Sequence, residues 1–114
     1  MYIVYTKNVY MKKSPLDGIV DFEWDKGNLS HIKIHNVNSE EAEDLYFDLN
    51  NTLREDLGHS ISEKRFIIIG KTQKGRLLYQ VFTIRIDKIR VISSRDINKK
   101  EVRLYEKKVS RTKV

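Results

Sequence analysis

Hydrophobic and polar positions alternate with a period of two in several stretches of the chain, a pattern that predicts strands. In residues 19–24 the alternation places Val20, Phe22 and Trp24 on the buried face. The apolar run 65–71 is short enough for a strand inside a sheet, and turns at residues 73–75 and 87–88 separate the runs that follow. The predicted strands are residues 19–24, 65–71, 76–85 and 89–94, with weaker signals at 1–10 and 52–55.

Three other segments carry apolar residues at helical spacing, and each follows a residue suited to cap a helix. Asp25 precedes the first, residues 26–35. Capping boxes begin the other two, residues 39–48 and 99–108, at Asn38 with Glu41 and at Asn98 with Glu101. The inward positions are Leu29, Ile32, Ala42, Leu45, Tyr46, Leu49, Val102, Tyr105 and Val109. This order predicts an α+β fold: helices packed against a small antiparallel sheet, a three- or four-stranded meander plus an N-terminal strand.

Charge divides the chain into two halves of opposite sign. Residues 64–114 hold 16 Lys and Arg against 4 acids, whereas residues 1–63 hold 6 against 12. A basic half points to a polyanionic partner, most commonly a nucleic acid. The absence of cysteine excludes disulfides and thiolate metal sites. Because no apolar run approaches about 18 residues and the first ten resemble no signal peptide, we expect no membrane association and a cytoplasmic location.

Motifs for metal, nucleotide or nucleophilic chemistry are weak. His31 and His35 have the i, i+4 spacing of paired ligands, but no third ligand is defined, so we interpret them as hydrogen-bonding residues near a helix end. Gly70 and Gly75 belong to a hairpin, because a strand follows where a phosphate-binding loop needs a helix. No serine lies in the context of a nucleophile elbow. The sequence therefore predicts no metal centre.

Arginines are the distinctive feature of the predicted sheet. Five lie on strands or at their ends: Arg65, Arg76, Arg85, Arg90 and Arg95. Strict alternation in residues 89–94 places Ile89, Val91 and Ser93 on one face and Arg90, Ile92 and Ser94 on the other. Guanidinium groups suit bidentate contact with phosphate and can stabilise the charge of its transition state. The alternative is that these arginines are solvated or pair with acids such as Asp21 and Glu23.

The individual signals combine into a family pattern. The first half reads Phe22-Glu23-Trp24-Asp25-x-Gly27-Asn28-x-x-His31-Ile32-x-x-His35-x-Val37, then Glu40-Glu41-Ala42. The second half reads Arg65, Ile69-Gly70-x-Thr72, Gly75-Arg76-x-Leu78, Ile89-Arg90-x-Ile92-Ser93-x-Arg95 and Glu101-x-x-x-Tyr105. Residues 19–108 thus resemble the BrnT toxin family. The resemblance divides the expected single domain, 1–114, into an N-terminal extension 1–18, a BrnT-like core 19–108 and a basic tail 109–114.

The resemblance implies a toxin of the RelE class, with a small sheet and helices, no metal and no nucleotide cofactor. Such a toxin cleaves RNA, here by attack of a ribose 2′-OH on the neighbouring phosphorus, and a BrnA antitoxin neutralises it. The antitoxin is a ribbon-helix-helix protein, so the toxin would meet DNA only through the antitoxin complex. Two alternatives stay open: a non-catalytic nucleic-acid or protein binding module of the same fold, and a direct DNA-binding repressor.

Roles for individual residues follow from the same resemblance. Arg90 and Arg95 would contact the scissile phosphate, Arg65 and Arg76 would orient it, and His35 would be a candidate base. Tyr79 and Tyr105 would stack on a base or supply a proton, although Tyr105 also falls on an inward helix position. We interpret Glu101 as the capping acid. General affinity for the RNA backbone would come from Lys71, Lys99, Lys100 and Arg103.

Overall fold

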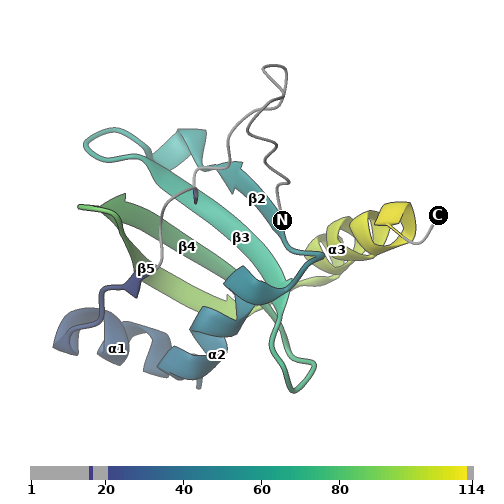
Figure 1. Ribbon diagram of the computed structural model, residues 1–114, viewed down its shortest axis with the longest axis horizontal. Helices are drawn as coiled ribbons and strands as arrows, with labels where there is room; N and C mark the ends of the chain where they lie inside the picture. Colours follow the sequence, from purple (N-terminus) through teal and green to yellow (C-terminus); the bar gives the residue numbers. More distant parts are fainter. Residues whose placement is uncertain (1–15, 17–20, 113–114) are drawn as a thin grey trace.

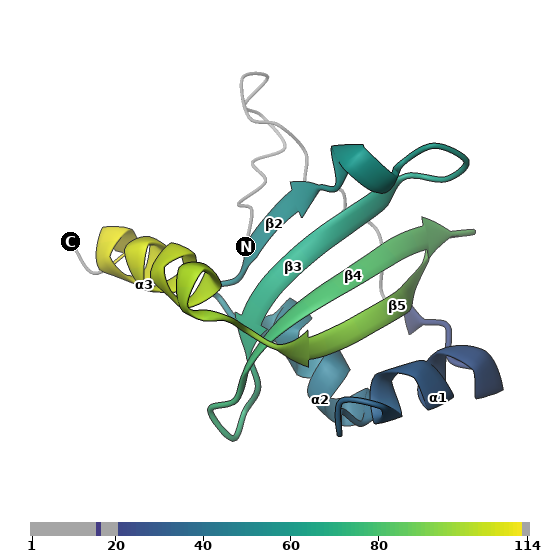
Figure 2. The same cartoon turned by 180° about the vertical axis from the view of Figure 1, so that it is seen from behind.

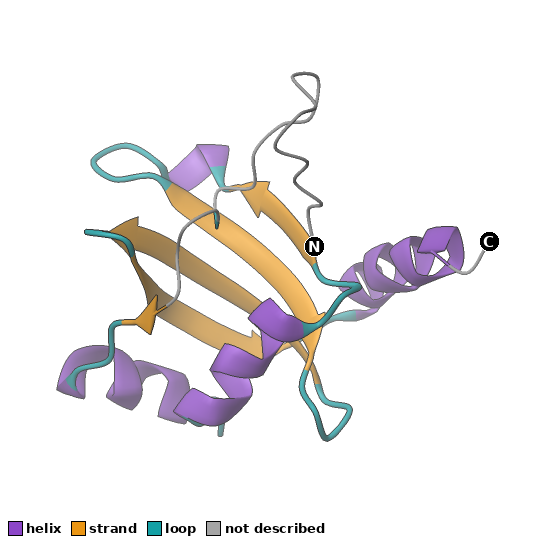
Figure 3. Ribbon diagram, in the orientation of Figure 1, coloured by secondary structure: helices purple, strands orange, loops and turns teal. Residues whose placement is uncertain are grey.

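The computed structural model describes Leu16 and residues 21–112, so the predicted strand or arm at 1–10, Val20 and the last two residues of the predicted basic tail lie outside the described residues. Figures 1 and 3 show the elements. The strands are β1 (Asp21–Phe22), β2 (Thr52–Glu55), β3 (Arg65–Lys71), β4 (Leu77–Arg85) and β5 (Lys88–Asp96). The helices are α1 (Lys26–Lys33), α2 (Ser39–Asp44) and α3 (Lys99–Thr112), with short 3-10 helices at Leu45–Phe47 and Leu57–His59.

The described strands form one sheet in the order β1-β5-β4-β3-β2. Strands β2 to β5 make an antiparallel meander, and β1 is added in parallel to β5. The predicted α+β class is therefore confirmed, with one correction. The sheet is mixed and not purely antiparallel, because the chain passes through α1, α2 and the meander before β5 comes to lie parallel beside β1. β1 ends at Phe22, two residues before the end of the predicted 19–24 strand.

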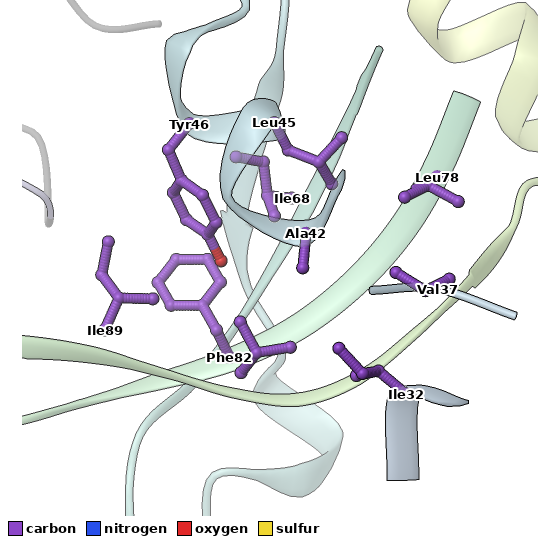
Figure 4. Packing of buried hydrophobic residues seen from close by; sticks show 10 residues of the cluster. Ile32, Val37, Ala42, Leu45, Tyr46, Ile68, Leu78, Phe82 and Ile89 are labelled. Atoms are coloured by element: carbon purple, nitrogen blue, oxygen red, sulfur yellow. The ribbon is translucent and has the colours of Figure 1, made fainter. Parts of the chain in front are cut away.

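Helices α1 and α2 cover one face of the sheet, which we call the helix face. α2 crosses in front of the strands in Figure 1, and Figure 4 shows the Tyr46 ring beside Phe82 of β4 in the core. The buried set is Ile32, Val37, Ala42, Leu45, Tyr46, Ile68, Leu78, Phe82, Ile89 and Val91. Gly70 allows the 3-10 helix to approach β3, because a Cβ there would lie 3.2 Å from the Leu45 Cβ.

Capping explains why each helix begins where it does. The Asp25 carboxylate accepts from the backbone N–H of Gly27 and Asn28, and both predicted capping boxes are present. Two predicted core positions are wrong. Leu49 is 73 % exposed, since the helix tightens after Asp44 and ends before it. Leu29 is also exposed, and Asn28 is buried in its place, donating to the carbonyls of Glu23 and Val91.

The second face of the sheet is largely uncovered by the described helices, and we call it the open face. Among the described helices, α3 alone packs on this face: its Tyr105 and Val109 cover the end near Ile67 and Ile69. Figure 2 shows β3, β4 and β5 from this side with α3 displaced to one end. α3 is longer than predicted and runs to Thr112.

The sequence predicts the position of one hairpin turn better than that of the other. Gly75 adopts φ +92° as expected of a turn glycine. The second turn lies one residue earlier than predicted, at Ile86 and Asp87, whose φ angles are 48° and 61°. Two consecutive residues with positive φ between paired strands match a type I′ turn, for which isoleucine is a poor residue.

Candidate nucleic-acid interface

The register of the meander places basic side chains in rows across the open face. Arg65 of β3 pairs with Thr83 of β4, and Thr83 pairs with Arg90 of β5. Directly paired residues share a face, so Arg65 and Arg90 lie on either side of Thr83, about two strand spacings or ~10 Å apart. A second row contains Ile69, Tyr79 and Arg95.

A β-bulge brings Arg90 and Arg95 to the same face. Val81 pairs with Ser93 but Phe82 pairs with Val91, which leaves Ile92 as an extra residue in β5. The strict alternation expected from the sequence is therefore wrong beyond Val91. Ser93 lies on the face of Arg90, and Ser94 turns to the helix face. Bulges of this kind often re-aim side chains beside functional sites.

Arg95 belongs to a compact cluster at the α3 end of the open face. Its guanidinium carbon lies 4.1 Å from the Tyr79 ring centroid, a cation–π contact. Its Nη1 and Nη2 donate to Glu101 Oε1 and Oε2, both at 2.9 Å. Burial acts to raise the pKa of Glu101, but the hydrogen bonds from Arg95 and from the Asn98 N–H hold it below the usual value. Glu101 is thus both the capping acid and the partner of Arg95.

Arg90 is held at the other end by two carboxylates. Its Nη1 lies 2.8 Å from Asp25 Oδ2 and 3.0 Å from Glu23 Oε1, and its side chain is 17 % exposed. The hydrogen bond from Arg90 holds the pKa of Asp25 below the usual range. Because Asp25 also caps α1, Arg90 links the start of that helix to the open face.

Arg65 differs from Arg85 and Arg90 in having no carboxylate partner among the described residues. Arg85 donates from Nε and Nη2 to Glu63, at 2.8 and 3.0 Å. Arg65 faces the same region, since it contributes with Arg85 and Arg90 to lowering the pKa of Glu63. However, its half-buried side chain makes no hydrogen bond or ion pair with any residue that the structure describes. Its donors are therefore free for an anion.

Arg76 and His35 lie together elsewhere, at the corner where the α1–α2 connection meets the start of β4. Arg76 Nη1 and Nη2 donate to the carbonyls of Asn36 and His35, at 2.7 and 2.9 Å. Its Nε donates to Asp96 Oδ1 at 2.8 Å, and Nη1 approaches Glu41 Oε2 at 3.3 Å. The guanidinium is committed to contacts within the fold. The structure therefore brings four of the six predicted catalytic residues to one face and leaves these two at the corner.

A family model described as the ribonuclease toxin BrnT of a type II toxin-antitoxin system matches residues 24–101, more than half of the chain. The chain belongs to the BrnT family. Among curated proteins, no relative matches the sequence. Membership in this family supports a general assignment as a ribonuclease toxin with a protein antitoxin and an RNA substrate.

The cations predicted to give this BrnT chain general RNA affinity surround the α3 end. Lys71 is exposed at the end of β3, with its Nζ 5.7 Å from the Tyr105 ring centroid. Lys99, Lys100 and Arg103 are exposed on α3. Tyr105 itself is buried and donates its hydroxyl to Asp48 Oδ2 at 2.8 Å, and burial and this carboxylate raise its pKa well above the ordinary value. That places Tyr105 in the packing of α3.

One residue of the BrnT open face was not predicted from the sequence. Arg54 of β2 pairs with Ile67, which faces the open side, so Arg54 faces it too. Its exposure and its lack of a carboxylate partner within the described chain set it beside Arg65. The sequence feature that could have pointed to Arg54 is its position in the weakly predicted strand 52–55, which precedes the arginine-bearing strands.

Within the described part of the chain, no three or more His, Cys, Asp or Glu side chains come together as metal ligands would. None of its helices is long and apolar enough to cross a membrane.

Proposed function

We propose that this BrnT protein is a metal-independent endoribonuclease whose active surface is the open face of the sheet. The observation that carries the proposal is the row Arg65–Thr83–Arg90, continued by Tyr79 and Arg95 on the same face through the bulge at Ile92. A sheet face that collects guanidinium groups, without a helix over its centre in the described chain, can accept a phosphodiester between strands. The scissile phosphate would lie over Thr83, between Arg65 and Arg90.

The chemistry that fits this surface is transesterification within RNA. The ribose 2′-oxygen attacks the adjacent phosphorus and gives up its proton, while the 5′-oxygen of the next nucleotide leaves and takes one. The products are a 2′,3′-cyclic phosphate and a 5′-hydroxyl. The five-coordinate transition state carries more negative charge on its oxygens than the substrate, and fixed guanidinium groups stabilise that difference. DNA lacks the 2′-OH and resists this reaction.

The contacts in the structure suggest different roles for the arginines. Arg65 meets the phosphate first, because its donors are unoccupied. Arg90 is held in place by Glu23 and Asp25, and it stabilises charge without leaving that position. Arg95 and Tyr79 form a stacked pair that suits a neighbouring base, and the Tyr79 hydroxyl would supply a proton.

Arg76 and His35 were expected to take part in catalysis, and we now propose a different role for them. The Arg76 donors are all directed at acceptors of the fold, and His35 supplies one of these through its backbone carbonyl. We therefore propose that Arg76 fixes the α1–α2 connection against β4 and β5, and that neither side chain reaches the substrate.

The partner proposed for this protein is a BrnA-like antitoxin that masks the open face. Its own acidic side chains would compete with RNA for Arg65, and any contact with operator DNA would come through the antitoxin. Because the proposed substrate is cellular RNA, the proposed site of action is the cytoplasm.

The test is expression of the chain alone in a bacterium, with growth as the readout. The unaltered protein should arrest growth, and Arg65→Gln should relieve the arrest at equal protein level. Lys33→Gln is the matched control, because it removes one exposed cation from α1 on the helix face. A folded, abundant protein that never arrests growth would favour the non-catalytic binding module instead.

A further inference from the structure

Arg54 is the open-face arginine that no motif and no ion pair of the fold accounts for. Arg76, Arg85, Arg90 and Arg95 each pair with a carboxylate. Arg54 is exposed on β2 and pairs with no described carboxylate. Its guanidinium makes no hydrogen bond or ion pair with the residues that the structure describes, so its donors are available to an anion from outside the chain.

The register makes Arg54 and Arg65 neighbours. Arg54 pairs with Ile67, and Arg65 lies two residues before Ile67 on the same strand and the same face. Diagonal positions of this kind across an antiparallel pair are about 7–8 Å apart, within the joint reach of two arginine side chains. Arg54 also contributes to lowering the pKa of Glu101, so its charge adds to the field on this face.

We propose that Arg54 and Arg65 form a second phosphate subsite, which binds the RNA phosphate next to the scissile one on the β2 side. The proposal rests on the function proposed above. Arg90, Arg65 and Arg54 lie on β5, β3 and β2, in that order across the sheet. A single strand of RNA crossing the β-strands meets them in succession, with Arg65 shared between two phosphates. Such contacts fix the register of the strand and read no base.

The experiment measures binding separately from cleavage. The probe is a short fluorescent single-stranded RNA with 2′-O-methyl groups, which cannot be cut, and anisotropy is followed as salt is varied. Arg54→Gln should weaken binding roughly tenfold, as expected for a lost charged hydrogen bond, and should lower the salt slope by about 0.7 for one phosphate. Lys33→Gln, which removes a cation from the helix face, should leave the slope unchanged.

Arg54→Lys gives a second variant that preserves charge. It should restore the salt slope and only part of the affinity, since an ammonium lacks the bidentate fork of guanidinium. A structural role for Arg54 would instead lower the melting temperature and leave the slope unchanged.

The outcomes separate this proposal from the ribonuclease proposal. If Arg54→Gln binds the probe like Lys33→Gln, the subsite is wrong even if the unaltered protein cuts RNA. If the unaltered protein cuts no RNA but shows the Arg54-dependent slope, the subsite stands and the ribonuclease proposal fails. Failure of the unaltered protein to bind the probe contradicts both.

Discussion

Replacing Arg76 by alanine separates a structural arginine from a catalytic one. The resemblance to the family predicts that Arg76 is a site residue. In the structure, however, its guanidinium joins the α1–α2 connection, α2 and β5, an arrangement that we call the clamp. If the clamp is its role, Arg76→Ala should lower the free energy of unfolding and leave the chemistry of the remaining folded protein unchanged.

The size of the expected loss in the free energy of unfolding follows from the acceptors that lose the Arg76 guanidinium as their donor. The carbonyls of His35 and Asn36 each lose a charged hydrogen bond, worth about 1.5 kcal/mol. Asp96 is 68 % exposed, so its ion pair adds less than about 1 kcal/mol. The expected loss is about 3 kcal/mol, which for a chain of this size corresponds to roughly 12 °C in melting temperature.

Thermal and urea unfolding of Arg76→Ala and Arg76→Lys measure this loss, and RNA cleavage well below the melting temperature measures activity. Lysine should recover little stability, because its ammonium cannot serve two carbonyls and a carboxylate in one plane. A variant with unaltered stability and abolished cleavage would refute the clamp and return Arg76 to the active surface.

Three further predictions concern stability alone. Ile86→Asn should raise the unfolding free energy by about 1 kcal/mol, because Ile86 is 96 % exposed at φ 48° and asparagine tolerates that backbone better; an unchanged melting temperature would argue against strain. Glu101→Gln should destabilise the protein at pH 7, and the difference should shrink as the pH falls below about 4, since a depressed folded pKa stabilises only while the carboxylate is ionised; a constant difference in urea titrations across pH would exclude this. Tyr46→Phe should cost about 1–3 kcal/mol by chemical denaturation, because it leaves the buried Gln80 Oε1 without its 2.6 Å donor, and a neutral result would require another partner for that oxygen.

Much of the fold could be predicted because local signals agree with it. The capping boxes at Asn38 and Asn98 act within one turn of chain, and the short apolar run in residues 65–71 needs no distant partner to be visible. The exposure of Leu49 could not be foreseen in this way. It depends on α2 tightening into a 3-10 turn where Leu45 packs on Gly70, a contact between distant segments.

The sequence showed that arginines lie on the predicted strands, but it did not show which of them share a face of the sheet. Alternation alone separates Arg90 from Arg95, and only the bulge at Ile92 reunites them, because it adds one residue to β5 and reverses the faces beyond it. The commitment of Arg76 to backbone carbonyls likewise depends on the path of the α1–α2 connection. Arg54 carries no motif, and the register of β2 against β3 is what places it beside Arg65.

The most direct test of the open-face account is cleavage of RNA by the purified chain with and without Arg65. The chain can be made by cell-free synthesis, which avoids arresting a host. The unaltered protein and Lys33→Gln should cut single-stranded RNA to products with 2′,3′-cyclic phosphate and 5′-hydroxyl ends. Arg65→Gln should keep the same melting temperature and lose most of that activity. Equal cleavage by a folded Arg65→Gln protein would contradict the assignment of the open face as the active surface.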